Sequence, residues 1–485
     1  MPAADAGPRA YHGGMGDPPA GPPRPIARHV LALALPALAQ QYLHLVVRLS
    51  DQYLADHFDL PDPAARDAYL SALTTAGYLY WFVSSYTVLV SVGSTALVAR
   101  FVGGGDREGA KRATAQAVLL ALAFGVVGAA AGSVGLPPLV AALGLSGPAA
   151  ALCVAYLTPL AALLPFQITE AACVACLAGA GDTRTGLKVL GGVAVLNVPL
   201  AWGLCVGVGP VEGLGFVGIA LGTGLSHVVG CITILALLAR GRSGLVLRRA
   251  DLAPDRGLMA RLLRVSVPAG IDSLSVAFCQ LWFLSIVNRL GNVAAAAHGV
   301  ALQWEALGFL AGAAFGTAAM TLVGQNLGAR DPHRAARGGW VAFGMGCGAM
   351  TVMGGLFYAL ARPMFRAFCH EPELEPVVAA GVPVLRLIAF AMPALASQIV
   401  FTAALRGAGD ARVPVLFSWI GFFGVRIPLA YLLTRPEVDL GPLGTVPGFD
   451  LGLYGAWVAM VVDIWVRGAF FAARFAGGRW KKIEV

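Results

Sequence analysis

Charged side chains are scarce in this chain. Asp, Glu, Lys and Arg make up 12% of its 485 residues, whereas soluble globular domains carry about 25%. Hydrophobic residues account for 58%, and the mean hydropathy is +0.74. The scarcity of charge excludes a soluble globular protein and predicts a polytopic membrane protein embedded in a lipid bilayer.

The motifs of enzymes and of nucleic-acid-binding proteins are also missing. Gly103–Gly105 is not followed by the Lys-Ser/Thr of a phosphate-binding loop. Cys173 and Cys176 lie in an apolar segment without a second Cys pair, so we interpret them as packing residues rather than metal ligands. The net charge of +8 is spread between apolar segments instead of forming one patch. We therefore expect no enzyme, no cofactor, no metal and no nucleic-acid partner.

What the chain does contain is a series of apolar segments long enough to span a membrane. A bilayer core is crossed by about 20 apolar residues in a helix, so we predict an all-α fold with about twelve transmembrane helices, six in each half. The segments fall at about 30–56, 70–99, 113–134, 149–179, 187–208, 215–239, 258–288, 293–323, 340–361, 377–404, 412–433 and 451–473.

Composition also predicts the domain boundaries. Residues 1–27 are rich in Pro, Gly and Ala without an apolar core, which indicates a disordered cytoplasmic tail rather than a signal peptide. We then expect an N-lobe at 28–239, a cytoplasmic connection at 240–257, a C-lobe at 258–474 and a second cytoplasmic tail at 475–485.

Lys and Arg are unevenly distributed between alternate connections. One set of connections holds 22 basic residues and the other holds 5. The richer set comprises 100–112, 184–188, 240–264, 330–337, 406–412 and 474–482. Because cytoplasmic loops are enriched in Lys and Arg, this set and both termini are predicted to be cytoplasmic. We expect a monomer in the inner or plasma membrane.

The two halves of the chain repeat each other. LAGAGDTR at Leu177–Arg184 matches LRGAGDAR at Leu405–Arg412, and NVPLAW at Asn197–Trp202 matches RIPLAY at Arg426–Tyr431. A third match, TALVARFVGGGDREGAKR against TLVGQNLGARDPHRAAR, precedes these two in both halves. Since six spans per half is an even number, the duplication predicts two pseudo-symmetric lobes of the same orientation around a central cleft.

The first apolar segment, from Arg28 to Phe58, has one polar face. It carries four polar residues at helical spacing: Gln41, His44, Arg48 and Asp51. An ionisable group inside the bilayer costs about 2.5–3.5 kcal/mol on insertion scales, so we expect Asp51 to face a cavity or a partner. The alternative is an Arg48–Asp51 ion pair that neutralises itself.

Further polar residues lie at membrane depth and are candidates for the cavity: Glu170, Asp272, His298 and Glu305. His298 and Glu305 are seven residues apart and so share a helix face. Glu305 beside Trp304 offers a carboxylate and an aromatic surface to a lipophilic cation. The alternative is an internal pair of Glu305 with Arg386.

Asp463 lies in the last apolar segment, four residues before Arg467. This spacing allows an ion pair on one helix face, which we favour over a role in transport.

The ordered motifs resemble those of the multidrug and toxic compound extrusion (MATE) transporters. The resemblance spans about residues 28–473 and rests on Pro36 with Asp51 fifteen residues later, and on ALVARFVGGGDREGAKRA, LAGAGDTRTG, NVPLAW and ALRGAGDARVP. It implies twelve helices in two lobes, and efflux of small organic, usually cationic, compounds driven by inward flow of protons or sodium ions. The position of Asp51 is a cation or proton site of the N-lobe in that family.

The polar segments and the resemblance together give two sets of candidate residues. Ion coupling is expected at Asp51, Asn197, Arg48 and His44. Substrate binding is expected at Asp272, Glu305, Trp304, His298, Glu170 and Gln41.

Two positions depart from the pattern of the family. One branch has Asn-x-x-x-Asp in the fifth helix, whereas Asn197 is followed by Ala201; another branch has an acidic residue where this chain has Val276. Sodium prefers several oxygen ligands, so these departures favour a single carboxylate that takes up a proton, with sodium as the alternative. The alternative function is a flippase for lipid-linked or polyanionic cargo, which would need several basic groups in the cleft.

Overall fold

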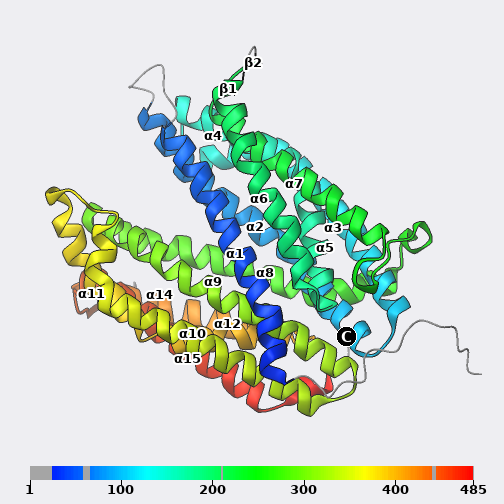
Figure 1. Cartoon of the computed structure of the whole chain (residues 1–485). Coiled ribbons are helices and arrows are strands. Elements are labelled where there is room, and N and C mark those ends of the chain that lie inside the picture. Colours follow the sequence, from blue (N-terminus) through cyan, green and yellow to red (C-terminus); the bar gives the residue numbers. More distant parts are fainter. Residues whose placement is uncertain (1–24, 58–65, 209–210, 440–443, 484–485) are drawn as a thin grey trace, which may run out of the picture.

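The computed structural model describes residues 25–57, 66–208, 211–439 and 444–483, most of which are helical (Figure 1). Within these residues, ten helices are long and apolar enough to cross a membrane alone. Two helix pairs, bent by 52° and 56° at short breaks, bring the number of spans to 12 if each pair is one span. The predicted all-α membrane fold with about twelve spans is therefore confirmed.

The elements of the first half are α1 (Ile26–His57), α2 (Arg66–Gly103), α3 (Arg107–Ala142), the bent pair α4 (Gly147–Ala162) and α5 (Leu164–Gly179), α6 (Thr183–Val206), the hairpin β1 (Gly207–Val208) and β2 (Val211–Glu212), and α7 (Phe216–Ala239). Two short turns, η2 (Arg242–Gly244) and η3 (Arg249–Leu252), lead to the second half.

The elements of the second half are α8 (Arg256–Asn288), α9 (Asn292–Gly328), α10 (Pro332–Arg366), η4 (Pro372–Leu374), the bent pair α11 (Glu375–Ala389) and α12 (Met392–Gly407), the span made of α13 (Arg412–Trp419), the π-helix η5 (Ile420–Arg426) and α14 (Ile427–Thr434), the hairpin β3 (Glu437–Asp439) and β4 (Thr445–Pro447), α15 (Gly452–Ala476) and η7 (Arg479–Lys482).

The duplicated motifs build the same local structures in both halves. Gly181 and Gly409 have φ angles of +91° and +89°, a region in which glycine is favoured, directly after α5 and α12. Two residues earlier in each motif, Gly179 and Gly407 let helices approach closely: a Cβ atom there would lie 2.6 Å from Thr95 O and 2.3 Å from Met320 O, respectively. The repeated glycines thus have a structural reason in each lobe.

Helix α1 contacts both lobes. Near its start, Val30 and Leu33 are buried in a core with Phe315 and Phe401 of the second half. Near its end, Leu54 packs against a core of the first half. The helix therefore connects the C-lobe core to the N-lobe core, although its sequence belongs to the first half.

The two lobes join at the end of the molecule that carries the C-terminus (Figure 1). At this seam, Thr321 donates a hydrogen bond to Ala178 O at 3.0 Å, and Gln325 Nε2 donates to Gly179 O at 2.9 Å. Arg100 Nη2 donates to Ala408 O at 3.0 Å, so bonds run in both directions between the lobes. We call this the closed end.

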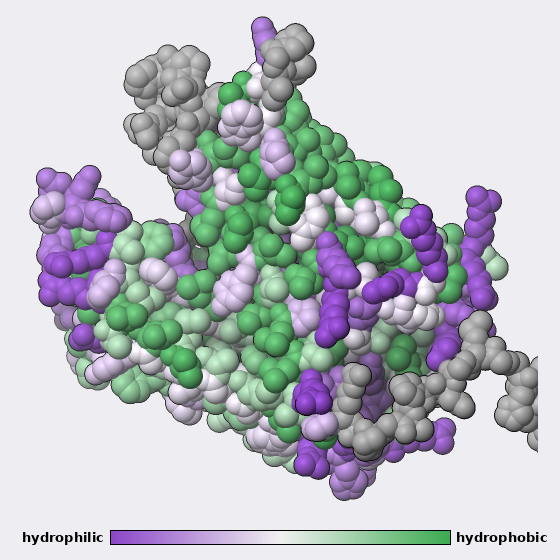
Figure 2. Space-filling model, in the orientation of Figure 1, coloured by the Kyte–Doolittle hydropathy of each residue, from purple (hydrophilic) through white to green (hydrophobic). Residues whose placement is uncertain are grey.

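At the opposite end, the lobes diverge. Figure 1 shows the β1–β2 end of the N-lobe and the α11 end of the C-lobe well apart, and Figure 2 shows a notch in the surface between them. Apolar side chains cover the body of the molecule between hydrophilic ends (Figure 2). Val134, Val195 and Val352 are 78%, 75% and 68% exposed, as expected for side chains that face lipid.

Candidate functional site

Asp51 is held in the N-lobe by a chain of hydrogen bonds across three helices. The hydroxyl group of Thr223 on α7 donates to Asp51 Oδ2 at 2.8 Å. The same hydroxyl oxygen accepts a hydrogen bond from Asn197 Nδ2 on α6 at 2.9 Å. Asn197 is 1% exposed and Thr223 is 7% exposed, so this contact is shielded from solvent. The structure thus brings Asp51 and Asn197, both predicted from the sequence, to one place.

Two acceptors of this cluster remain without a hydrogen-bond donor among the described residues. They are Asp51 Oδ1 and Asn197 Oδ1, and both atoms are buried. A buried acceptor without a donor costs about 1–3 kcal/mol, and more when it is charged. The site is therefore suited to receive a positively charged species at these oxygens.

Ala201, which stands where one branch of the family has a second carboxylate, lies at a close contact between α6 and α7. Ala201 is fully buried, and the backbone of α7 lies directly against it at Gly222. A Cβ atom at Gly222 would lie 2.5 Å from the Cα atom of Ala201. The missing side chain of Gly222 therefore allows α6 and α7 to approach closely at Ala201.

The remaining residues of the polar face of α1 have different surroundings. The side chains of His44 and Arg48 are exposed, and Gln41 is half-buried. Within the described part of the chain, no ion pair joins Arg48 to Asp51, so the self-neutralising pair considered above is not formed. His44 interacts electrostatically with His227 of α7.

Glu170 of α5 is paired rather than free. Its Oε2 atom lies 2.7 Å from Nδ1 of His227 on α7, and the two residues are 2% and 9% exposed. Glu170 Oε1 is buried without a hydrogen-bond partner. His227 was missed in the sequence, although a lone ionisable residue in the apolar segment 215–239 is the signal that could have identified it. Thr223 had no such signal, because threonine is common in membrane helices.

In the C-lobe, Asp272 of α8 forms an ion pair with Arg406 of α12. Asp272 Oδ2 lies 2.6 Å from Arg406 Nη2, and Asp272 is 5% exposed. Arg406 was counted with the basic connections in the sequence, so this partner was not expected. The pair gives Asp272 a counter-charge, while its Oδ1 atom is buried without a hydrogen-bond partner among the described residues.

Glu305 of α9 is half-buried, and no hydrogen bond or ion pair to its carboxylate is found in the described residues. The expected alternative partner, Arg386, instead lies over the ring of Tyr358, with its guanidinium carbon 5.5 Å from the ring centroid. The neighbouring Trp304 packs edge-to-face on Phe368 at 5.6 Å, and its indole Nε1 is buried without a partner. Glu305 and Trp304 thus each keep a polar group for which the described residues provide no hydrogen-bond partner.

His298 lies two helical turns before Glu305 on α9 and is part of the packed core. It is 3% exposed and accepts a hydrogen bond from Trp457 Nε1 at 3.1 Å through its Nδ1 atom. This contact ties α9 to α15 inside the C-lobe.

A buried cluster of charged side chains connects η5 and α15 inside the C-lobe. Asp463 is fully buried and lies 2.8 Å from Arg426 and 2.6 Å from Arg467, which confirms the expected Asp463–Arg467 contact and adds a second arginine. Arg426 ends the π-helical stretch η5 and also donates to Gln280 Oε1 at 3.0 Å. One carboxylate thus holds two guanidinium groups.

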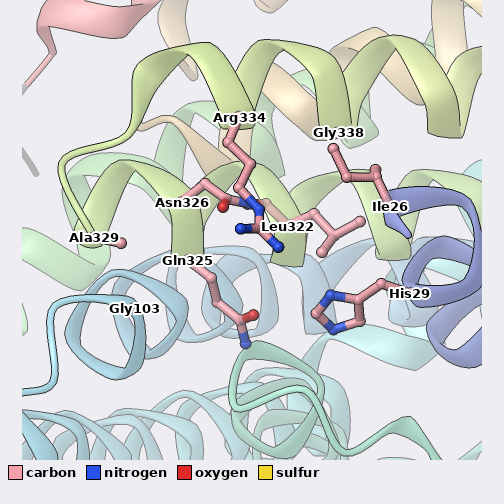
Figure 3. Close-up of a pocket in the computed structure, with 9 residues that line it drawn as sticks. All are labelled: Ile26, His29, Gly103, Leu322, Gln325, Asn326, Ala329, Arg334 and Gly338. Carbon is pink, nitrogen blue, oxygen red and sulfur yellow. The ribbon is translucent and has the colours of Figure 1, made fainter. Parts of the chain in front are cut away.

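A cavity of about 170 Å³ lies at the closed end, where both lobes contribute residues. Figure 3 shows Arg334, Gln325 and His29 pointing toward its centre from α10, α9 and α1. It is lined by Ile26, His29, Gly103, Leu322, Gln325, Asn326, Ala329, Arg334 and Gly338. The backbones are in close contact beside it, since a Cβ atom at Gly103 would lie 1.9 Å from Gln325 O.

Known proteins share the sequence pattern over nearly the whole chain. The MatE family model matches residues 63–202 and 268–432. The probable multidrug resistance protein NorM of Thermotoga maritima is 27% identical over 469 residues, or 95% of this chain and 94% of that protein. The multidrug resistance protein PmpM of Pseudomonas aeruginosa is 25% identical over 445 residues, or 90% of this chain and 91% of that protein.

Solved structures share the fold. A MOP superfamily transporter from Pyrococcus furiosus, reported to have a binding pocket of reverse polarity, gives a TM-score of 0.84 at 18% identity and covers 94% of this chain and 97% of its own. An outward-facing multidrug resistance MATE family transporter gives 0.82 at 19% identity with the same coverage. With the family match over more than half of its length, the chain belongs to the MATE family: it is a multi-pass membrane transporter with about twelve helices in two lobes, and not an enzyme.

Proposed function

We propose that this transporter exports organic cations, including drugs, in exchange for protons, and that Asp51 carries the proton. The observation behind the proposal is the buried Asp51 Oδ1, which has no hydrogen-bond donor in the described residues. A proton on Asp51 would neutralise the buried charge and supply a donor of its own. Relatives that match almost the full chain are named as a probable multidrug resistance protein, NorM, and a multidrug resistance protein, PmpM.

The ligand count favours a proton over sodium. Asp51 Oδ1 and Asn197 Oδ1 are free acceptors, and Thr223 uses its hydroxyl hydrogen on Asp51. Ala201 adds no side-chain oxygen, because its side chain is a methyl group. A hard cation usually takes about six oxygen ligands, whereas a proton needs one.

The cargo is proposed to bind in the C-lobe at Glu305 and Trp304. Glu305 forms no hydrogen bond or ion pair in the described residues, although its charge interacts with that of Arg426, whereas Asp272 forms an ion pair with Arg406. A cation would gain charge attraction from Glu305 and an aromatic face from Trp304. Gln41 remains a candidate on the N-lobe side of the cleft.

Coupling is proposed to run through α1. Its first turns pack into the C-lobe core at Val30 and Leu33, and Asp51 lies about 20 residues further on, in the N-lobe. Pro36 interrupts the backbone hydrogen bonds between these two regions and so allows the helix to bend there. Neutralising Asp51 would favour drier packing of the far part of α1 and shift the balance between the two openings of the cleft.

Orientation follows from the basic connections. With both termini in the cytoplasm of a cell-membrane protein, the closed end faces the cytoplasm and the diverging lobes face outward. In this state, protons from outside would reach Asp51 and cargo would leave.

The flippase alternative is less compatible with the charges of the C-lobe. A polyanionic cargo needs several basic groups free of carboxylates. In the described chain, Arg406 pairs with Asp272, while Arg426 and Arg467 share Asp463. Of the other arginines in the membrane segments, Arg48 and Arg386 form no ion pair in the described residues, and they lie in different lobes, so they do not form one cluster of basic groups for a pyrophosphate.

Efflux from everted membrane vesicles tests the proposal. A pH gradient, acidic inside, is imposed in sodium-free buffer, and accumulation of a fluorescent organic cation is followed for the wild type, Asp51→Asn and the control Asp450→Asn, whose position is exposed in the β4–α15 loop. We expect rapid accumulation by the wild type and the control, and its loss in Asp51→Asn or after a protonophore. Equal accumulation by Asp51→Asn would refute the proposal.

A further inference from the structure

The Glu170–His227 pair is a buried pair of titratable side chains in the N-lobe, and the scheme above does not use it. Its two partners come from α5 and α7 and lie 2.7 Å apart. Glu170 Oε1 has no hydrogen-bond partner in the described chain and points at the backbone of α7, where a Cβ atom at Gly230 would lie 2.3 Å from it. Gly230 therefore makes the space in which this carboxylate lies.

The pair lies next to the Asp51 cluster on the side of the closed end. His227 follows Thr223 by four residues, so both side chains share one face of α7, about 6 Å apart along the axis. Because α7 runs from the open end to the closed end, His227 lies deeper than Thr223, whose hydroxyl group contacts Asp51. His227 is also close enough to Asp51 for their charges to interact.

Few titratable side chains of the surrounding helices lie near this pair. Helix α1 presents His44 and Asp51 to His227. Cys173 of α5 and Cys231 of α7 are the titratable neighbours of Glu170.

The other neighbouring helices place their charges elsewhere. Helix α6 presents neutral Asn197 and Val193 at this depth, and its Lys188 is exposed nearer to the closed end. In the described parts of α2, α3 and α4, the charged residues lie at the helix ends, such as Arg100 and Lys111. A proton that reaches the pair is therefore balanced by Glu170 itself.

We infer that Glu170 and His227 form a second proton-binding site, which receives the proton from Asp51 on its way to the closed end. In this step the O–H bond of protonated Asp51 breaks and an N–H bond forms on the His227 imidazole, so Asp51 regains its negative charge. The resulting imidazolium is stabilised by the carboxylate of Glu170 at hydrogen-bond distance. The inference rests on the proposed proton coupling at Asp51 and adds the residues that pass the proton inward.

Cation exchange, a partial reaction of antiport, distinguishes a role of the pair in proton transfer from a structural role. Exchange of labelled cation for unlabelled cation across the membrane needs no net proton movement, whereas net efflux needs proton release at the closed end. A relay defect should therefore slow net efflux and leave cation exchange intact. A defect in folding or packing would slow both.

The test uses reconstituted full-length protein with Glu170→Gln, His227→Gln and Gly230→Ala, the last of which displaces the carboxylate without removing it. Thr233→Val on the exposed face of α7 is the matched control. We expect net efflux driven by a pH gradient to fall at least tenfold in the three variants, while binding and exchange of tetraphenylphosphonium stay within twofold of the wild type. Glu170→Asp should recover part of the net efflux.

Two results would overturn the inference. If net efflux and exchange fall together, the pair is structural; if neither falls, the pair is not on the proton path. Asp51→Asn in the same assay keeps the two proposals apart. A wild-type response of Asp51→Asn refutes the proposed function, whereas loss in Asp51→Asn with normal net efflux in the three variants refutes the relay alone.

Discussion

Thr223 donates a hydrogen bond to one carboxylate oxygen of Asp51 at 2.8 Å, and the other carboxylate oxygen has no donor among the described residues. The carboxylate is therefore oriented by a neighbouring helix but only half satisfied. This combination suits a group that must be both fixed in place and able to take up a proton.

The first prediction concerns this hydrogen bond. Thr223→Val keeps the side-chain shape and removes the hydroxyl group, which also releases Asn197. A hydrogen bond to a charged group contributes about 1.5–3 kcal/mol, so we expect proton-driven transport to fall about tenfold or more. Thr223→Ser keeps the hydroxyl group and should transport within threefold of the wild type. Equal rates for the Val and Ser variants would show that the hydroxyl group does not matter.

The second prediction concerns the cargo. Glu305→Gln should weaken binding of a fluorescent lipophilic cation by about tenfold, which corresponds to about 1.4 kcal/mol, because the unpaired carboxylate is lost. Binding of a neutral dye should change little. Glu373→Gln removes an exposed carboxylate just before α11 of the same lobe and is the control. Fluorescence titration of the purified proteins gives both affinities, and unchanged cation affinity in Glu305→Gln would remove Glu305 from the site.

The third prediction concerns the seam between the lobes. Gly103→Val places a branched side chain where a Cβ atom alone would lie 1.9 Å from Gln325 O, so the closed end must separate. We expect longer distances between spin labels at Glu108→Cys and His333→Cys, and slower transport. Gly77→Val, on the same helix with open space around its Cβ position, should leave both unchanged. Identical label distances in Gly103→Val would mean that the seam adapts locally.

The fourth prediction concerns the buried cluster of the C-lobe. Asp463→Asn leaves Arg426 and Arg467 without their shared counter-charge, which should cost about 3–5 kcal/mol of stability. A clear drop of the unfolding temperature in detergent is expected, whereas the exposed substitution Asp450→Asn should have almost no effect. A normal unfolding temperature for Asp463→Asn would show that water or other groups already screen the arginines.

The architecture was predictable because it depends on signals that are local in sequence. Apolar length sets the spans, and the duplicated GAGD motifs impose the same glycine turn at Gly181 and Gly409. The bends within the two helix pairs were not predicted, since each pair reads as one continuous apolar segment.

The site was only partly predictable, because the sequence of one helix does not show which residues of another helix it contacts. Asn197 was expected near Asp51 through the family resemblance, and the structure places them in one cluster. Asp272 was expected as a candidate for the cavity, but its partner Arg406 lies in a segment that the sequence indicates to be a basic loop. His227 is a lone histidine in an apolar segment, and its pairing with Glu170 on another helix is seen only in the structure.

The central claim is that Asp51 binds the proton that is exchanged for the cargo. It is tested most directly by measuring proton movement during cation transport. Proteoliposomes in sodium-free buffer contain a pH-sensitive dye, and addition of an organic cation on the opposite side starts transport. The account predicts that cation entry moves protons out with the wild type, and that neither movement occurs with Asp51→Asn. Cation transport that requires sodium and moves no protons would contradict it.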